Sequence, residues 1–127
     1  MTGHGRPPQE DPRRLLGARG EELVARWYRA RGYRVLDRNW RCRQGELDLV
    51  LDRAGVVVFC EVKTRRSDAF GTPAEAVGWR KQQRIRGLAA AWLRGSGVRA
   101  RDLRFDVASV LLPARGSATI TVLEGAF

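Results

Sequence analysis

Residues 45–63 read GELDLVLDRAGVVVFCEVK, two apolar runs separated by a short polar turn. The runs Leu47–Leu51 and Val56–Lys63 have the composition of strands, and Ala54-Gly55 suits the tight turn of a hairpin. The stretch Val56–Cys60 is apolar on both faces of its strand, which predicts a central position in a sheet. The segment therefore predicts a β-hairpin whose second strand lies inside a larger sheet.

A two-residue turn at Ala54-Gly55 would determine which residues oppose each other across this hairpin. Asp48 then faces Glu61 and Glu46 faces Lys63, with all four side chains on one face. A three-residue turn would break this arrangement. Two carboxylates opposed at the end of a buried strand repel each other at pH 7, so the pattern calls for a compensating cation.

A divalent cation is one such compensation. Mg²⁺, or Mn²⁺ in its place, binds oxygen ligands, commonly one or two carboxylates with water and a substrate phosphate. Asp48 and Glu61 would supply carboxylates and the Val62 backbone carbonyl a third oxygen, and Glu46 is a further candidate ligand. Lys63 would orient a water nucleophile or stabilise developing charge. The alternative is an ordinary salt-bridged sheet face, because an Asp…Glu-x-Lys pattern is common.

Helices are predicted on both sides of the hairpin. Apolar residues at helical spacing predict one over Gly17–Arg31. The sequence Thr72-Pro73-Ala74-Glu75 is a capping box that starts a second, and Gly95-Ser96-Gly97 ends it. The order of elements predicts one α/β domain over residues 15–127, preceded by a disordered arm of residues 1–14. The remaining predicted strands are Tyr33–Leu36, Leu103–Leu112 and Thr119–Leu123.

Glu21 lies on the flank of the apolar side of the first predicted helix, where an unpaired carboxylate is costly. One interpretation is that Glu21 only favours the helix N-terminus. The other is that the helix delivers Glu21 to the hairpin, where it would join Asp48 and Glu61 as a third acid beside Lys63.

The charge of the 127-residue chain points to a polyanionic partner. It has 24 basic against 14 acidic residues, a net charge of +10, and all the basic residues except Lys63 and Lys81 are arginine. Such an excess favours a phosphate backbone, because neutralised phosphates release condensed counterions. The alternative is an arginine-biased composition without a nucleic-acid partner.

Several classes of protein are excluded by composition. The only histidine, His4, lies in the predicted arm, which argues against a histidine triad or a histidine-bound zinc. Cys42 and Cys60 have no further cysteine partners, so a zinc knuckle or a disulfide scaffold is not supported. No apolar run is long enough to span a bilayer, and the first residues lack the apolar segment of a signal peptide, so we expect no membrane association and a cytoplasmic location.

A set of motifs extends over nearly the whole chain after residue 14: Gly17-x-x-Gly20-Glu21, Asn39-Trp40-Arg41, Gly45-Glu46-Leu47-Asp48-Leu49, Phe59-Cys60-Glu61-Val62-Lys63-Thr64-Arg65, Phe70-Gly71, Ala76-Val77, Lys81 and Ala126-Phe127. This set resembles the bacterial YraN family, an uncharacterised group related to archaeal Holliday-junction resolvases within the restriction-endonuclease-like PD-(D/E)xK superfamily. Two departures are Leu47 in place of the motif proline and the lack of the Gln-x-x-x-Tyr element of some related nucleases.

The resemblance implies an α/β fold with a restriction-endonuclease-like central mixed β-sheet flanked by helices, and Mg²⁺-dependent phosphodiester cleavage. It implies that Asp48 and Glu61 are metal ligands, that Lys63 is the catalytic lysine, and that Glu21 is a helix-borne acid completing the catalytic set. Resolvase relatives act as dimers, which leaves a homodimer open.

Four basic residues are predicted phosphate contacts: Arg43, Arg65, Arg66 and Lys81. Lys81 falls on the apolar stripe of the second helix, which runs from Val77 to Trp92, so it would extend from the core side toward the hairpin. Residues 67–72 are a candidate mobile loop over bound nucleic acid. No base-reading helix is recognisable, which favours recognition of DNA structure over DNA sequence.

Three functions are therefore open. The first is a metal-dependent endonuclease acting on structured, for example branched, DNA. The second is a nucleic-acid-binding module with an inert carboxylate cluster. The third is a small scaffold protein whose charge is only compositional.

Overall fold

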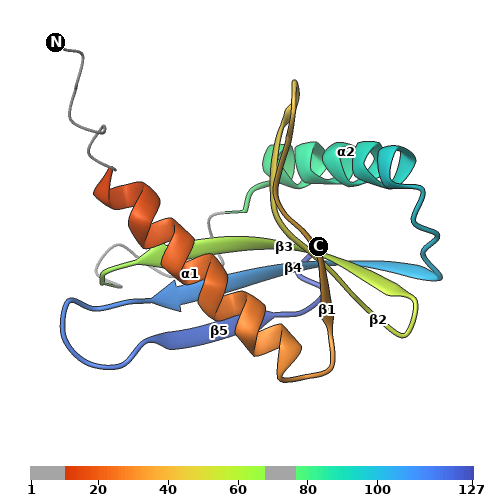
Figure 1. Cartoon of the computed structure of the whole chain (residues 1–127). Coiled ribbons are helices and arrows are strands. Elements are labelled where there is room, and N and C mark those ends of the chain that lie inside the picture. Colours follow the sequence, from red (N-terminus) through yellow and green to blue (C-terminus); the bar gives the residue numbers. More distant parts are fainter. Residues whose placement is uncertain (1–10, 68–76) are drawn as a thin grey trace, which may run out of the picture.

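The predicted hairpin of residues 45–63 lies at the centre of the structure, a computed structural model that describes residues 11–67 and 77–127 (Figure 1). No helix in this part of the chain is long and apolar enough to cross a bilayer. The elements, in chain order, are α1 (Pro12–Arg29), β1 (Arg34–Cys42), β2 (Gly45–Arg53), β3 (Val56–Arg65), α2 (Trp79–Ser96), β4 (Asp102–Leu111) and β5 (Thr119–Leu123).

The strands form one five-stranded sheet in the order β1-β2-β3-β4-β5. β3 pairs with β4 in parallel, and the other neighbours are antiparallel. A parallel pair requires a crossover connection, and α2 belongs to the segment that joins β3 to β4. The predicted α/β fold with a mixed sheet and flanking helices is confirmed, and it is consistent with a restriction-endonuclease-like architecture.

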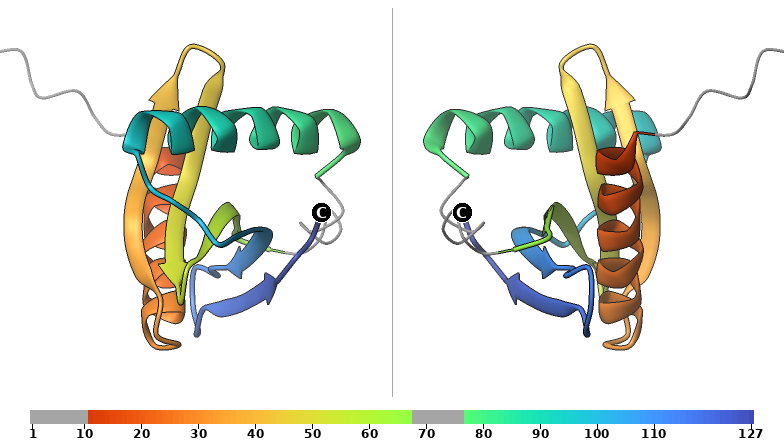
Figure 2. Two further views of the ribbon diagram at one scale, coloured as in Figure 1. Left: turned by 90° about the vertical axis from the view of Figure 1, so that its right-hand side faces the viewer. Right: turned by 90° about the vertical axis from the view of Figure 1, so that its left-hand side faces the viewer.

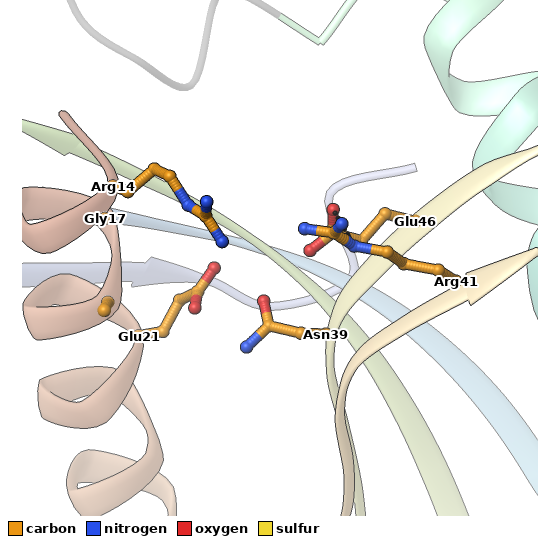
Figure 3. A pocket seen from close by; sticks show the side chains of 7 residues that line it. Arg14, Gly17, Glu21, Asn39, Arg41 and Glu46 are labelled. Carbon is orange, nitrogen blue, oxygen red and sulfur yellow. Dashed lines mark ion pairs between the residues drawn. The ribbon is translucent and has the colours of Figure 1, made fainter. Parts of the chain in front are cut away.

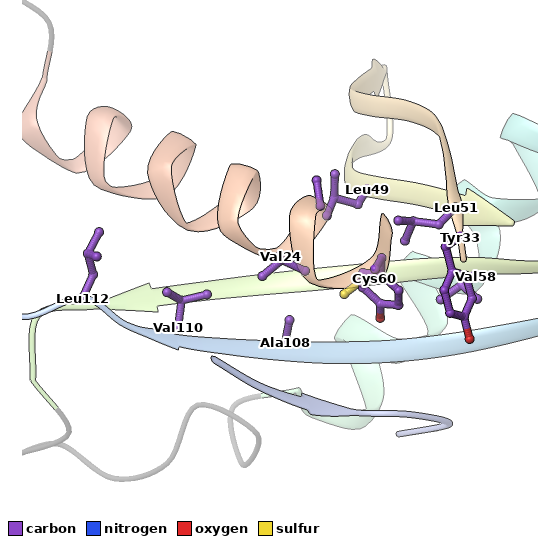
Figure 4. Packing of buried hydrophobic residues seen from close by; sticks show 11 residues of the cluster. Val24, Tyr33, Leu49, Leu51, Val58, Cys60, Ala108, Val110 and Leu112 are labelled. Carbon is purple, nitrogen blue, oxygen red and sulfur yellow. The ribbon is translucent and has the colours of Figure 1, made fainter. Parts of the chain in front are cut away.

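The central strand β3 is buried on both faces, as its apolar sequence predicted. Val58 and Cys60 join the core under α1, shown in Figure 4, whereas Val57 and Phe59 join the core under α2. The two helices lie on opposite sides of the sheet in both views of Figure 2. The sheet therefore separates two hydrophobic cores, one for each helix.

The β2–β3 hairpin has the predicted two-residue turn. Ala54 and Gly55 both have positive φ, 52° and 84°, as a type I′ turn requires. Pairing runs from Arg53 with Val56 to Leu49 with Cys60 and then stops. The register is as predicted, but the pairs expected next, Asp48 with Glu61 and Glu46 with Lys63, do not form.

The pairing stops because β2 leaves β3 and continues with β1 alone. The β1–β2 ladder extends to Cys42 with Gly45, and this hairpin rises from the sheet toward α2 (Figure 1). Leu47 consequently joins the core under α2, although its spacing from Leu49 predicted the other face. A Cβ placed on Gly45 would lie 3.3 Å from Leu88 Cδ1, so the hairpin tip lies against α2. We call the opening between β2 and β3 the fork.

Two predicted boundaries near the N-terminus are wrong. α1 begins at Pro12, not Gly17, because the Asp11 side chain accepts a hydrogen bond from the Arg13 N–H at 2.9 Å and caps the helix. Residues 12–14 are thus helical and not part of a disordered arm, and residues 1–10 lie outside the described residues. β1 is longer than the predicted strand of residues 33–36, because its polar second half pairs with β2.

The start of the second helix also differs from the prediction. α2 begins at Trp79, and Gly78 is an extended N-cap, so Val77 is buried but not helical. The predicted capping box of residues 72–75 and most of the predicted loop of residues 67–72 lie outside the described residues. The C-terminal end is as predicted, with Gly97 in the left-handed conformation at φ 72°.

A buried carboxylate joins α1 to β4 on the face away from α2. Asp106 is fully buried and accepts hydrogen bonds from the Tyr28 hydroxyl at 2.6 Å, the Arg104 guanidinium at 2.9 Å and the Gly125 N–H at 3.0 Å. Burial, together with the neighbouring Cys60 and Asp106, raises the pKa of Tyr28 above its ordinary value. Both oxygens of Asp106 accept hydrogen bonds, so this network has a structural role.

Gly20 allows α1 to approach the end of β3 closely. A Cβ at Gly20 would overlap the Thr64 side chain, whose hydroxyl is buried and lacks a hydrogen-bond partner within the described part of the chain. Because Glu21 follows Gly20 directly, this contact determines how near Glu21 lies to the end of β3.

We predict that Gly20→Ala lowers the free energy of unfolding by about 1–3 kcal/mol, because the added methyl group forces α1 away from Thr64. Gly17→Ala, on the same helix with no atom within 4 Å of the new Cβ, is the matched control and should be neutral or stabilising by up to about 1 kcal/mol. Urea denaturation followed by circular dichroism measures both. Equal effects would contradict the close approach.

Candidate active site

The fork places Asp48 beside the end of β3. Its Oδ2 atom accepts a hydrogen bond from the backbone N–H of Val62 at 2.8 Å. This bond links β2 to β3 where the backbone ladder has ended, so a side chain replaces a backbone carbonyl as the acceptor. The carboxylate is held by the backbone, next to Glu61 rather than opposite it in a ladder.

Among the acids of this region, Asp48 has the pKa that is shifted furthest from its ordinary value. Burial raises its pKa to about 7, and the nearby charges of Glu61, Glu21 and Glu46 act in the same direction, whereas the Val62 hydrogen bond lowers it. No basic side chain of the described residues lies within ion-pair distance of Asp48. At neutral pH its charge is thus only partly compensated.

Glu61 is paired with two lysines from different elements. Its Oε1 atom lies 2.7 Å from Lys81 Nζ and 3.9 Å from Lys63 Nζ, and the Glu61 side chain is 12% exposed. Burial and the adjacent charge of Lys81 lower the pKa of Lys63. Lys81 extends from α2 into the site, as predicted, but as a partner of Glu61; contact of Lys81 with a phosphate stays a prediction.

Glu21 and Glu46 lie on opposite sides of a cleft of about 440 Å³ between α1 and the β1–β2 hairpin (Figure 3). With its amide nitrogen turned toward them, Asn39 donates hydrogen bonds to Glu46 Oε1 at 3.0 Å and to Glu21 Oε1 at 3.2 Å. Burial raises the pKa of Glu21, and the Asn39 hydrogen bond opposes that shift. One amide therefore bridges two carboxylates that would otherwise repel each other.

Asn39 was not predicted as a site residue. It belongs to the quoted Asn39-Trp40-Arg41 motif, but nothing in its spacing places it between Glu21 and Glu46. The structure marks Asn39 by its φ of 50°, a left-handed conformation that asparagine tolerates better than most residues. Such a conformation inside a strand accompanies functional sites more often than ordinary sheet.

The other predicted residues are separated by the fork. Glu46 pairs with Arg41 Nε at 3.2 Å and faces the cleft with Glu21, not Lys63. Arg43 lies at the tip of the hairpin, beyond the carboxylates. Arg65 and Arg66 follow the catalytic candidates at the end of β3, and Arg66 donates to the Leu112 carbonyl at 3.5 Å. The structure brings together Glu21, Glu46, Asp48, Glu61, Lys63 and Lys81, which we call the carboxylate–lysine cluster.

The donors of this cluster suit a hard cation with few protein ligands. In residues 11–67 and 77–127, no three acidic, cysteine or histidine side chains converge closely enough to hold a metal ion. Asp48 and Glu61 with the Val62 carbonyl would offer two carboxylates and a peptide oxygen, a set that Mg²⁺ or Mn²⁺ completes with water. The site thus fits a partly hydrated divalent ion, and not an ion enclosed by protein.

An ordinary salt-bridged sheet face would leave no acid without a cation. Glu61 does meet that description through Lys81 and Lys63. Asp48 and Glu21 do not, because neither has an ion-pair partner among the described residues, although the raised pKa of each shows that charge is unfavourable there. Such unfavourable carboxylates are a mark of functional sites.

Comparison with known proteins gives a consistent result over most of the chain. Residues 20–110 match the model of the uncharacterised protein family UPF0102. The chain is 50% identical over 115 residues to a UPF0102 protein of Nocardia farcinica, covering 91% of each chain. It is 52% identical over 112 residues to a UPF0102 protein of Frankia alni, covering 88% of this chain and 93% of the relative. UPF0102 is the YraN family, so the predicted family is confirmed.

We predict that Asp48→Asn stabilises the protein at pH 8 by on the order of 2 kcal/mol. The folded pKa of Asp48 lies above its unfolded value, so its favourable contribution is present below about pH 4 and is lost as the pH rises through 7. Asparagine keeps an oxygen for the Val62 N–H and carries no charge.

Urea denaturation of Asp48→Asn and wild type across this pH range tests the prediction. The gain should shrink toward pH 4. Asp52→Asn, on the same strand, is the control: it breaks the ion pair with Arg34 at 2.8 Å and should give no gain at pH 8. A gain from Asp48→Asn that does not change with pH would contradict the assignment.

Proposed function

Since this chain belongs to the uncharacterised protein family UPF0102, we propose its function from the site itself: a divalent-metal-dependent nuclease that hydrolyses phosphodiester bonds of structured DNA. The observation that carries the proposal is Asp48, a partly buried carboxylate held at the fork beside Glu61 without an ion-pair partner among residues 11–67 and 77–127. A protein with a net charge of +10 otherwise has no shortage of cations to pair with an acid.

The side chains of the cluster have separate roles in this proposal. Asp48, Glu61 and the Val62 carbonyl hold the ion, with Glu46 near enough to act on Asp48 through its charge. Bound Mg²⁺ or Mn²⁺ supplies Lewis-acid polarisation of the phosphate and a lower pKa for bound water. A bound divalent ion would therefore bring the positive charge that Asp48 lacks among the described residues.

Lys63 and Glu21 act on the reacting groups from two sides. The Lys63 amine is placed to hydrogen-bond an attacking water, and its lowered pKa eases the loss of a proton relative to an ordinary lysine. Glu21 faces the same region from α1 and can orient a water or accept its proton. Lys81 holds Glu61 in position through the 2.7 Å ion pair.

A nucleic-acid-binding module with an inert cluster is the second candidate. It is favoured by the lysines that already occupy Glu61 and by the lack of three convergent metal-binding side chains in the described ranges. The two candidates differ in hydrolysis, because only the first requires Asp48 and Lys63 for bond cleavage.

We predict that the purified protein with Mn²⁺ cleaves labelled branched DNA, and that Asp48→Asn or Lys63→Ala lowers the rate by at least about 100-fold. Binding measured in Ca²⁺ should persist in both variants. Gel separation of end-labelled junctions, flaps and plain duplex measures the rate and the preferred substrate.

Neighbouring glutamates on α1 provide a matched pair of variants. Glu21→Gln should lose at least about tenfold in rate. Glu22→Gln should not, because Glu22 pairs with Arg38 at 2.6 Å, outside the cluster. Full cleavage by Asp48→Asn would overturn the catalytic assignment, and binding without any cleavage would favour the second candidate.

We also predict that Mn²⁺ raises the melting temperature of the wild type but not that of Asp48→Asn. An ion that binds only the folded state stabilises it in proportion to the logarithm of its concentration. Differential scanning fluorimetry over a Mn²⁺ series measures the effect, and Asp52→Asn, which should respond like the wild type, is the control. An equal response of all three proteins would contradict an ion held by Asp48.

A further inference from the structure

The basic residues of this protein differ in whether acids already neutralise them. Arg34, Arg38 and Arg104 pair with carboxylates at 2.6–2.9 Å, so they add little field beyond their partners. α2 is different: its sequence carries Arg80, Lys81, Arg84, Arg86 and Arg94 and no acidic residue. Positive charge is thus concentrated along one helix.

Two of these arginines border a groove and make no ion pair with a described residue. Arg84 and Arg94 have no ion-pair partner in the described part of the chain, whereas Lys81 pairs with Glu61 and Arg86 lies over the Phe105 ring at 4.8 Å. Arg84 and Arg94, with Gln44, Gly87, Leu88 and Ala91, line a groove of about 270 Å³ where the hairpin tip meets α2. Arg43 lies in the same hairpin tip.

Gly87 has no structural reason to be glycine within the described molecule. A Cβ placed on it meets no atom within 4 Å, and mid-helix glycine costs about 1 kcal/mol relative to alanine. Its neighbour on the groove, Ala91, is also small. Because the groove between the two arginines has a floor of small residues, the sugar–phosphate backbone of a nucleic acid could approach α2 closely.

The groove and the proposed active site both involve α2. Lys81, which contacts Glu61, lies one turn before Arg84, and the helix rise places Arg94 about 20 Å beyond Lys81. At 3.4 Å per base pair, this length corresponds to about six base pairs. Cations spread over this length of α2 suit an extended polyanion.

We propose that the groove between α2 and the β1–β2 hairpin tip binds the phosphate backbone of a duplex arm of the substrate. This proposal rests on the proposed nuclease function. It specifies that the DNA cleaved at the fork has a double-stranded arm that extends along α2. Arg84 and Arg94 contact phosphates, Arg43 adds charge at the tip, and the Gly87 floor admits the backbone.

Anisotropy of a fluorescein-labelled four-way DNA junction, titrated in Ca²⁺ over a salt series, tests this binding without any cleavage step. Arg84→Gln with Arg94→Gln should weaken binding about tenfold near 0.1 M salt and reduce the log–log salt slope by about 2, one for each lost phosphate contact.

Arg19→Gln with Arg115→Gln is the matched control, since it removes the same charge from α1 and from the segment between β4 and β5, and neither arginine has an ion-pair partner in the described part of the chain. It should change the salt slope by less than half as much. Gly87→Gln is a second, independent variant: it fills the groove with a better helix former, and should also weaken junction binding while raising the melting temperature.

A second assay separates the duplex-arm proposal from the nuclease proposal. Hydrolysis of the small diester bis(p-nitrophenyl) phosphate in Mn²⁺ should be unchanged in Arg84→Gln with Arg94→Gln, because that probe does not extend to the groove. An unaltered salt slope in this variant, or an equal change in the control, overturns the duplex-arm site even if the wild type cleaves DNA. A reduced slope supports it even if no cleavage is found.

Discussion

The hydrogen bond from the Val62 N–H to Asp48 at 2.8 Å is the contact on which the candidate site depends. The backbone ladder between β2 and β3 ends at Leu49 and Cys60, and an unpaired N–H at the end of a buried strand would be costly. The Asp48 carboxylate satisfies it. The same bond lets the β1–β2 hairpin leave the sheet and still keeps an acid beside Glu61.

Several carboxylates lie close together around this bond, and their mutual repulsion lowers the stability of the fold. The pKa of Asp48 and that of Glu21 are both raised, which means that each carboxylate would be more stable elsewhere. Partial compensation comes from three elements: Lys63 on β3, Lys81 on α2 and the Asn39 amide on β1. Such partial compensation costs stability, and the proposed divalent ion would offset this cost when bound.

The elements of the sheet were predictable where local chemistry dominates. The Ala54-Gly55 turn and the two-sided apolar run of β3 were recognisable, because a two-residue turn and burial on both faces leave clear residue patterns. The polar half of β1 was not, since its pairing with β2 depends on a neighbour and not on its own composition. The start of α2 at Trp79 was not predicted, because Gly78 has no side chain that marks an N-cap; the capping box of residues 72–75 lies outside the described residues.

Sequence patterns predicted which element carries each candidate residue, Glu21 on the first helix and Asp48, Glu61 and Lys63 on the hairpin strands, and they predicted the two-residue turn between those strands. These follow from short-range periodicity and turn geometry. Long-range contacts were needed to show that β2 leaves β3 after Leu49, that Asn39 bridges Glu21 and Glu46, and that Lys81 reaches Glu61. Those contacts join residues from separate elements, and their geometry depends on how the twisted hairpin and both helices pack, which no local pattern encodes.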